Sequence, residues 1–279
     1  MVPVFSIVSC IITLFVSLLL PVIALVVFAA GHKKQGIVSA WLLGALGFFV
    51  TQILIRLPIL TFLQGQSWFL SLAQNHLFGY AFSLAFTAGL FELAGRFAVA
   101  KLMRKNLTYN RALAAGLGHG GIEAMLLIGM TYVNNLIYIF MINSGTFDAV
   151  IAQTAALGVD VTQLELIRTQ LLTTSPALFL LAGFERILAM TGHAAMSMVV
   201  CWGVHSGKPL KCALVCLGIH TLLDLTAGIS LLSGTVLSQT TAYIIIYAIL
   251  VAMAALSLWI LKELQRRWRK EEVFHDPEK

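Results

Sequence analysis

Nine ionisable side chains fall inside long apolar stretches of this chain, and three pairs of them are spaced four residues apart. A charge inside hydrocarbon costs at least about 2.5–3.5 kcal/mol on insertion scales, so such residues usually face the interior of a helix bundle and serve a function. Residues i and i+4 of a helix share one face, so each pair predicts a polar stripe. The nine are Glu92 and Arg96, His119 and Glu123, Glu185, Arg186 and His193, and His220 and Asp224.

These residue types together suit the hydrolysis of an amide. A glutamate in an apolar site can act as a general base on water, and neutral histidines can donate to a developing oxyanion. Three histidines and a carboxylate can alternatively hold Zn²⁺ with a water completing the site, and His119, His193 and His220 are the candidate ligands. The chain has neither a His-Glu-x-x-His motif nor a Gly-x-Ser-x-Gly motif. The sequence therefore leaves a glutamic and a metal-assisted mechanism open.

The elements that must position these groups are membrane helices. Of the 279 residues, 59% are hydrophobic and 11% are charged, whereas soluble domains carry about 25% charge. A helix needs about 20 apolar residues to cross the hydrocarbon. We predict an all-α, multi-pass bundle in the cell membrane, formed as a single domain over 1–279 with a motif core at about 70–233. The seven qualifying stretches are 4–30, 37–58, 70–100, 111–141, 176–203, 209–233 and 240–261.

Depth along the helices predicts that four of the polar residues share one layer. At about 1.5 Å per residue, these four lie roughly 12–14 Å from the predicted cytosolic helix ends. Glu123 and Asp224 lie about one turn deeper, and Glu185 with Arg186 lies off the layer and is predicted to brace its helix. Gly116 and Gly120 form a small-xxx-small face that predicts close helix packing beside the layer. The four residues of the layer are Glu92, His119, His193 and His220.

The distribution of lysine and arginine predicts the orientation. These residues occur in every second connection and after residue 262, while the intervening connections hold almost none. Because cytosolic loops carry the excess of Lys and Arg, we expect the N-terminus outside and a charged cytosolic tail over 262–279. The net charge of +6 thus reflects topology, and no nucleic-acid partner is expected.

One predicted outer connection, 143–175, is long, and a short amphipathic helix is expected to begin there near Asp160. The cysteines lie in or beside apolar runs and predict no disulfide framework. They are Cys10, Cys201, Cys212 and Cys216.

Four motifs together resemble the YhfC family, which belongs with PrsW and the CAAX-processing proteases in a clan of intramembrane proteases. The resemblance covers most of the chain, from the third helix to the sixth, and its most specific part is the Gly-His-Gly-Gly-x-Glu-Ala block. The motifs are Phe91-Glu-Leu-Ala-Gly-Arg96, Gly118-His-Gly-Gly-Ile-Glu-Ala124, Phe184-Glu-Arg-Ile-Leu-Ala189 followed by His193 and Ser197, and His220-x-x-x-Asp224.

The resemblance implies a role for each matched residue. It makes Glu92 the water-activating glutamate, with Arg96 as the basic residue one turn later. Glu123 corresponds to the acid of the second motif. The two later histidines of the clan correspond to His193 and His220, and the last motif ends at Asp224. The clan typically carries a second acid directly after the first, where this chain has Leu93.

The leading hypothesis is therefore an intramembrane endopeptidase whose substrate is a membrane protein or peptide in the bilayer. Glu92 is its base, and His193 and His220 stabilise the oxyanion. A proton-coupled transporter is one alternative, because intramembrane His, Glu and Asp residues also relay protons. The departure at Leu93 keeps a third class open, a catalytically inactive scaffold or chaperone on the same fold. The sequence does not specify the oligomeric state.

Overall fold

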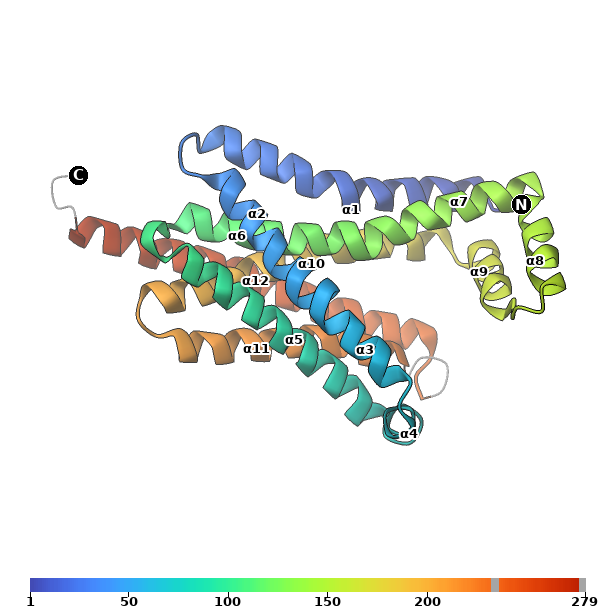
Figure 1. Cartoon of the computed structure of the whole chain (residues 1–279). Coiled ribbons are helices and arrows are strands. Elements are labelled where there is room, and N and C mark those ends of the chain that lie inside the picture. The colour runs from blue at the N-terminus through green and yellow to red at the C-terminus, as the bar shows by residue number, and fades with distance from the viewer. Residues whose placement is uncertain (232–235, 276–279) are drawn as a thin grey trace. The chain divides into compact units, whose positions relative to one another are not determined.

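The computed structural model describes residues 1–231 and 236–275, with side chains as far as Glu271. This part of the chain is helical and contains no β-strand, and seven of its helices are long and apolar enough to cross a membrane (Figure 1). The predicted all-α, multi-pass membrane fold is confirmed. The spans are Val4–Gly31 (α1), Ile37–Gln64 (α2 to α3), Leu77–Leu102 (α5), Tyr109–Ser144 (α6 to α7), Pro176–His205 (α10), Pro209–Leu231 (α11) and Gln239–Glu271 (in α12).

Two spans contain wider π-helical turns. The second span is α2 (Ile37–Phe48), a π-helical stretch over Phe49–Arg56 and α3 (Leu57–Gln64). The fourth span is α6 (Tyr109–Glu123), a π-helical stretch over Ala124–Gly129 and α7 (Met130–Ser144). Such stretches are rare and frequently mark functional sites. Neither is visible as a break in the apolar pattern of the sequence.

Two predicted segments differ from the structure, whereas the tail from 262 was expected to be a charged helix end. The stretch 70–100 is two helices, α4 (Ser67–Asn75) and α5, because His76 between them has a non-helical backbone with φ −137° and ψ 60°. The connection 143–175 holds α9 (Thr162–Thr173), close to the helix expected near Asp160, and also α8 (Thr146–Ala156), which was not expected. The tail from 262 continues α12 (Gln239–His275). The predicted helix end at 233 and the tail beyond 275 lie outside the described residues.

Backbone contacts divide the chain into two compact units. The first unit is Met1–Val22 with Ala124–Ile187, and the second is Ile23–Glu123 with Leu188–Lys279. In the first, the hydroxyls of Thr13 and Tyr132 both donate to the Phe179 carbonyl oxygen, at 2.6 and 3.2 Å. The single domain expected from the sequence stays a prediction.

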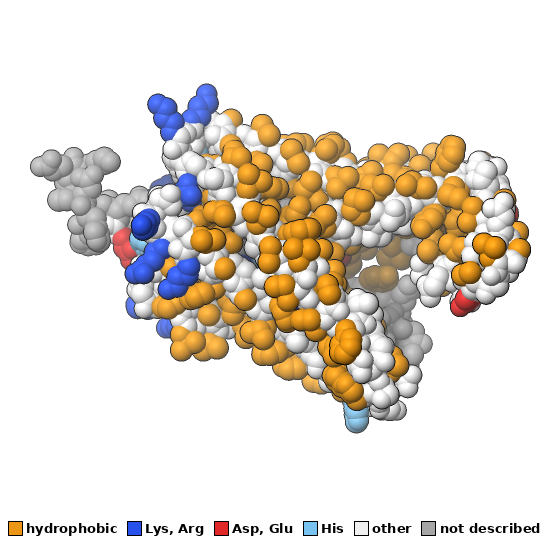
Figure 2. Space-filling model, viewed as in Figure 1, with side chains coloured by type: hydrophobic (Ala, Val, Ile, Leu, Met, Phe, Trp, Pro, Cys, Tyr) orange, Lys and Arg blue, Asp and Glu red, His pale blue; other side chains and the backbone are white. Residues whose placement is uncertain are grey.

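The second unit carries the charge asymmetry that the sequence suggested. Figure 2 shows lysine and arginine side chains gathered at one end of this unit, beside the connections that follow α1 and α5, while apolar side chains cover its helices. An apolar outer face suits contact with lipid, because hydrocarbon does not penalise it. The orientation of the basic end toward the cytosol remains a prediction.

Glycines bring the backbones of the second unit into contact. A Cβ on Gly44 of α2 would collide with the backbone of Ala115 on α6, and a Cβ on Gly118 of α6 would collide with the backbone of Trp41 on α2. A Cβ on Gly116 would lie 2.8 Å from Cα of Ala194 on α10. The close packing predicted from the small residues is therefore present between α2, α6 and α10.

Candidate active site

The carboxylate of Glu92 lies at the centre of a buried polar network in the second unit. Glu92 is on α5 and only 3% exposed. Its Oε2 atom lies 2.9 Å from Nε2 of His119 and 2.8 Å from Nε2 of His220. The Nη2 group of Arg96 donates to the same oxygen at 3.0 Å, and Nε2 of Gln52 donates to Oε1 at 2.6 Å. Side chains from four helical segments therefore converge on one carboxylate.

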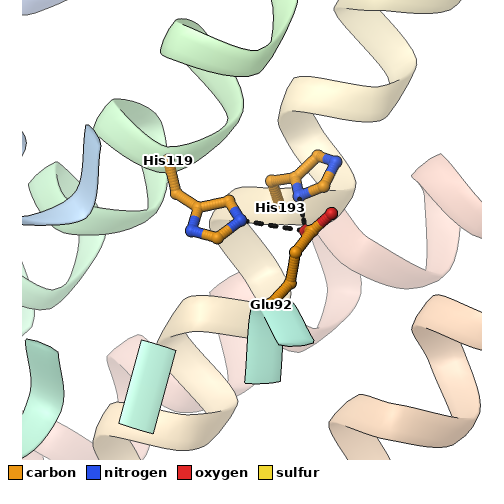
Figure 3. A group of neighbouring side chains, drawn as sticks. All are labelled: Glu92, His119 and His193. Atoms are coloured by element: carbon orange, nitrogen blue, oxygen red, sulfur yellow. Dashed lines mark hydrogen bonds and ion pairs between the residues drawn. The ribbon is translucent and has the colours of Figure 1, made fainter. Parts of the chain in front are cut away.

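His193 links this centre to a second glutamate. Its Nδ1 atom is 2.6 Å from Nη2 of Arg96 and 3.6 Å from Oε2 of Glu92. Its Nε2 atom is 2.7 Å from Oε2 of Glu123. Because a guanidinium only donates, Nδ1 accepts, and the ring proton is assigned to Nε2, which faces the carboxylate of Glu123. Figure 3 shows Glu92, His119 and His193 pointing toward one another from three different helices.

His220 is held in a similar way from the other side. Its Nε2 atom faces Glu92, and its Nδ1 atom lies 3.4 Å from Oδ2 of Asp224, one turn along α11. His193 and His220 thus each lie between the central carboxylate and an outer one. Outer carboxylates of this kind fix the orientation of a histidine ring and increase its basicity.

Local packing explains why the histidines reach Glu92. A Cβ on Gly120 of α6 would lie 2.8 Å from Cβ of His193, so the absence of a side chain there lets α10 approach. A Cβ on Gly89 of α5 would lie 3.3 Å from Cβ of His220 and 3.1 Å from Leu217. The ring of His119 also packs edge-on against Phe48, with centroids 5.3 Å apart. Glycines therefore let His193 and His220 approach the centre, and an aromatic ring packs against His119.

Gln52 and Arg56 are missed when only ionisable residues deep in the helices are considered. Gln52 lies in the π-helical stretch of the second span and binds Glu92 directly. Arg56 donates to Oε1 of Gln52 at 3.2 Å and to the Leu84 carbonyl oxygen at 2.8 Å. The i,i+4 spacing of an amide and an arginine in an apolar stretch was the available signal.

Comparisons with known proteins place this network in a family. A family model described as YhfC intramembrane metalloprotease matches residues 16–251. The chain is also 30% identical over 249 residues to a Bacillus subtilis (strain 168) protein described as "Uncharacterized membrane protein YhfC". The aligned residues cover 88% of this chain and 92% of that protein. The chain belongs to the YhfC family. No solved structure is significantly similar to it.

The described donor atoms of this YhfC-family protein fit a zinc-like ion. Glu92, His119 and His193 each offer one ligand atom, these atoms lie within 4.8 Å of one another, and all three residues are buried. Ligands of a tetrahedral zinc with bonds of 2.0–2.1 Å are about 3.3–3.4 Å apart, and the measured distances from Oε2 of Glu92 are 2.9 and 3.6 Å. The sequence suggested three histidines, whereas this group contains Glu92 in place of His220.

Arg96 competes with a cation for this position. Its guanidinium contacts Oε2 of Glu92 and Nδ1 of His193, two of the three donors. Like charges repel strongly in a dry interior. In the arrangement described, Arg96 therefore neutralises Glu92, and a bound ion would displace that contact.

The remaining intramembrane pair, Glu185 and Arg186, belongs to the first unit. Arg186 donates to the neighbouring carboxylate of Glu185 within the first unit. The bracing role suggested by the sequence stays a prediction. The four cysteines are free, as expected. The structure thus joins all seven expected site residues in one network, and their catalytic roles remain predictions.

Proposed function

We propose that this YhfC-family protein is an intramembrane endopeptidase that hydrolyses a peptide bond with water activated by a glutamate. The observation that carries the proposal is the convergence of His119, His220 and Arg96 on one oxygen of the buried Glu92. Held in this way, the carboxylate is positioned to take a proton from a water molecule next to it. Preorganised donors beside it can stabilise the oxyanion of a tetrahedral intermediate.

Five residues of the network have distinct roles in this proposal. Glu92 accepts the proton of the attacking water, and His220 donates from Nε2 toward the oxygen of the scissile carbonyl. His193 donates there from its other tautomer, with the ring proton on Nδ1, once the substrate has displaced the Arg96 contact. Glu123 and Asp224 hold the two histidine rings from outside, at 2.7 and 3.4 Å. In the free protein these histidines point at Glu92, so the substrate carbonyl must enter between them and the carboxylate.

The family description adds a metal-assisted version. Glu92, His119 and His193 would hold a zinc ion, which when bound would polarise the scissile carbonyl and acidify a water. If Glu92 is a ligand of the zinc ion, Glu123 becomes the carboxylate that accepts the proton of the attacking water. Glu123 suits this because it is adjacent to His193 and its side chain is 13% exposed, more than that of Glu92.

The substrate is proposed to be a membrane-inserted segment that enters beside α5 and α11. These two helices carry Glu92 and His220, and an apolar groove of about 390 Å³ lies on them. Leu93, the residue next to Glu92, lines this groove, so the position that carries a second acid elsewhere in the clan is used here as apolar surface. The groove also includes Leu90, Ala94 and Phe97 of α5 and Pro209 and Leu210 of α11.

The test is cleavage of a reporter membrane protein by Glu92→Gln in proteoliposomes, together with the zinc content of the purified protein. A general base contributes about 10²–10⁴-fold, so kcat is expected to fall by that amount. Glu185→Gln is the matched control, because it removes another intramembrane carboxylate, one that contacts Arg186. If the variant loses activity but keeps its zinc, Glu92 is the base. If it loses both, Glu92 is a ligand.

Full proteolysis by Glu92→Gln would refute the proposal. Uptake driven by a pH gradient, without cleavage by the wild-type protein, would instead favour the transporter alternative. Equal activity in the metal-free and zinc-loaded proteins would exclude the metal-assisted version.

A further inference from the structure

Three buried donor atoms of Arg96 and Ser197 have no hydrogen-bond partner among the described residues. They are Nε and Nη1 of Arg96 and Oγ of Ser197. Arg96 is 2% exposed and Ser197 is 4% exposed. A buried polar group left without a hydrogen-bond partner is destabilising. Arg96 on α5 and Ser197 on α10, which face each other, therefore both need a hydrogen-bond partner.

Arg96 and Ser197 line one small enclosed cavity. Its walls also include His119, Val99 and Cys201, and it leaves about 10 Å³ for the centre of a water-sized sphere. That volume is roughly what one water molecule needs, and buried waters typically make about three hydrogen bonds. Two N–H donors and one hydroxyl supply that number. A cation is excluded by the guanidinium charge, and the volume is too small for an organic group.

The cavity lies between the active site and the basic end of the second unit. Val99 is seven residues after Glu92 along α5, toward Lys101, and Cys201 is eight residues after His193 along α10. These offsets put the cavity about two helical turns or less from the network. Hydrolysis consumes one water for each peptide bond, and the surrounding hydrocarbon holds none.

We propose that this cavity is an internal water site, held by Arg96 and Ser197, from which water reaches Glu92 from the basic end of the protein. Arg96 joins the two sites directly, since its Nη2 group contacts Glu92 and its side chain lines the cavity. Ser197 is a positioning residue, which acts through the water and through Arg96. The use of the water in catalysis rests on the proposed function, whereas the hydration of the cavity does not.

The first test is radiolytic footprinting of the full-length protein in nanodiscs, in which bound water produces hydroxyl radicals that oxidise adjacent side chains. Cys201 lines the cavity, whereas the equally buried Cys216 does not. We expect Cys201 to be oxidised severalfold faster than Cys216 in the wild-type protein. Ser197→Val fills the cavity and should remove the difference, while Ser197→Ala leaves room for water and should keep it. Equal rates for the two wild-type cysteines would overturn the proposal.

The second test is cleavage kinetics with the same variants. Outer positioning groups typically contribute about 10–100-fold, so Ser197→Val is expected to lower kcat about tenfold with little change in KM, and Ser197→Ala to lower it less. Ser257→Val is the matched control, since Ser257 is also buried and its hydroxyl only donates to the Met253 carbonyl of its own helix.

The outcomes separate the two proposals. Unchanged kcat in a folded Ser197→Val protein would refute the catalytic use of the water. Rapid oxidation of Cys201 in a wild-type protein without proteolytic activity would support the water site and reject the proposed function.

Discussion

Replacing Gln52 by leucine is expected to lower kcat/KM for the reporter substrate about 10–100-fold. Gln52 is buried in the π-helical stretch of the second span, and its Nε2 group donates to Oε1 of Glu92 at 2.6 Å. Leucine has a similar size but no donor. The change therefore removes a hydrogen bond to the central carboxylate while it leaves the apolar packing nearly intact.

The magnitude follows from the burial of both groups. A hydrogen bond to a charged group contributes about 1.5–3 kcal/mol, and 1.4 kcal/mol corresponds to a factor of ten. The expected loss is therefore between about 10-fold and somewhat over 100-fold. Arg56 loses its contact with Gln52 but keeps the Leu84 carbonyl at 2.8 Å, so most of the effect should come from Glu92.

The assay is steady-state cleavage in proteoliposomes, with thermal unfolding measured on the same preparations. Gln66→Leu is the matched control, because that amide donates only to the Phe62 carbonyl one turn earlier, at 3.4 Å. A folded Gln52→Leu protein with the wild-type kcat/KM would show that Oε1 of Glu92 needs no fixed partner, and the reasoning would fail.

Three further predictions concern packing, substrate entry and pH. Gly120→Ala places a Cβ 2.8 Å from a side chain of α10 and should destabilise the protein by about 1–3 kcal/mol in thermal unfolding, whereas Gly218→Ala meets no atom within 4 Å and should not destabilise it. Leu93→Trp fills the apolar groove and should raise KM for a membrane substrate severalfold with little change in kcat; an unchanged KM would exclude entry there. Outside the membrane spans, hydrogen bonds from Thr162 lower the pKa of Asp160 below its ordinary value. The stabilisation of the start of α9 is thus fully present above the ordinary pKa of Asp160, and it is lost as the pH falls through the lowered pKa of the folded state. Hydrogen exchange, corrected for its intrinsic pH dependence, should therefore show that α9 opens in acid in the wild-type protein. The Asp160→Asn protein should not show this opening.

The seven spans and the polar stripes could be predicted from the sequence because hydrocarbon allows few alternatives. Backbone groups in lipid must be satisfied within a helix, so apolar length alone indicates a span. A charged residue in such a span must find partners inside the bundle. For this reason the spacing of the i,i+4 pairs, such as His220 with Asp224, is enough to predict a shared polar network.

What could not be predicted depends on contacts between helices. The π-helical stretch over Phe49–Arg56 turns Gln52 toward Glu92, and no pattern in the apolar residues marks that stretch. The break at His76 lacks a proline or a glycine. The group of three ligand atoms contains Glu92, His119 and His193, and the spacing of residues along the helices does not determine the distances between these atoms.

The glycine contacts also limit how this protein can evolve. A clash with a side chain can be relieved by a smaller residue at the partner position, as for Gly129, whose nearest atoms belong to the Leu18 side chain. A clash with a main-chain carbonyl has no such remedy. At Gly44 and Gly118 the opposing atoms are backbone, so no replacement of the facing residue can act as a genetic suppressor. Selection for restored function should recover compensating changes for Gly129 and only true revertants for the other two.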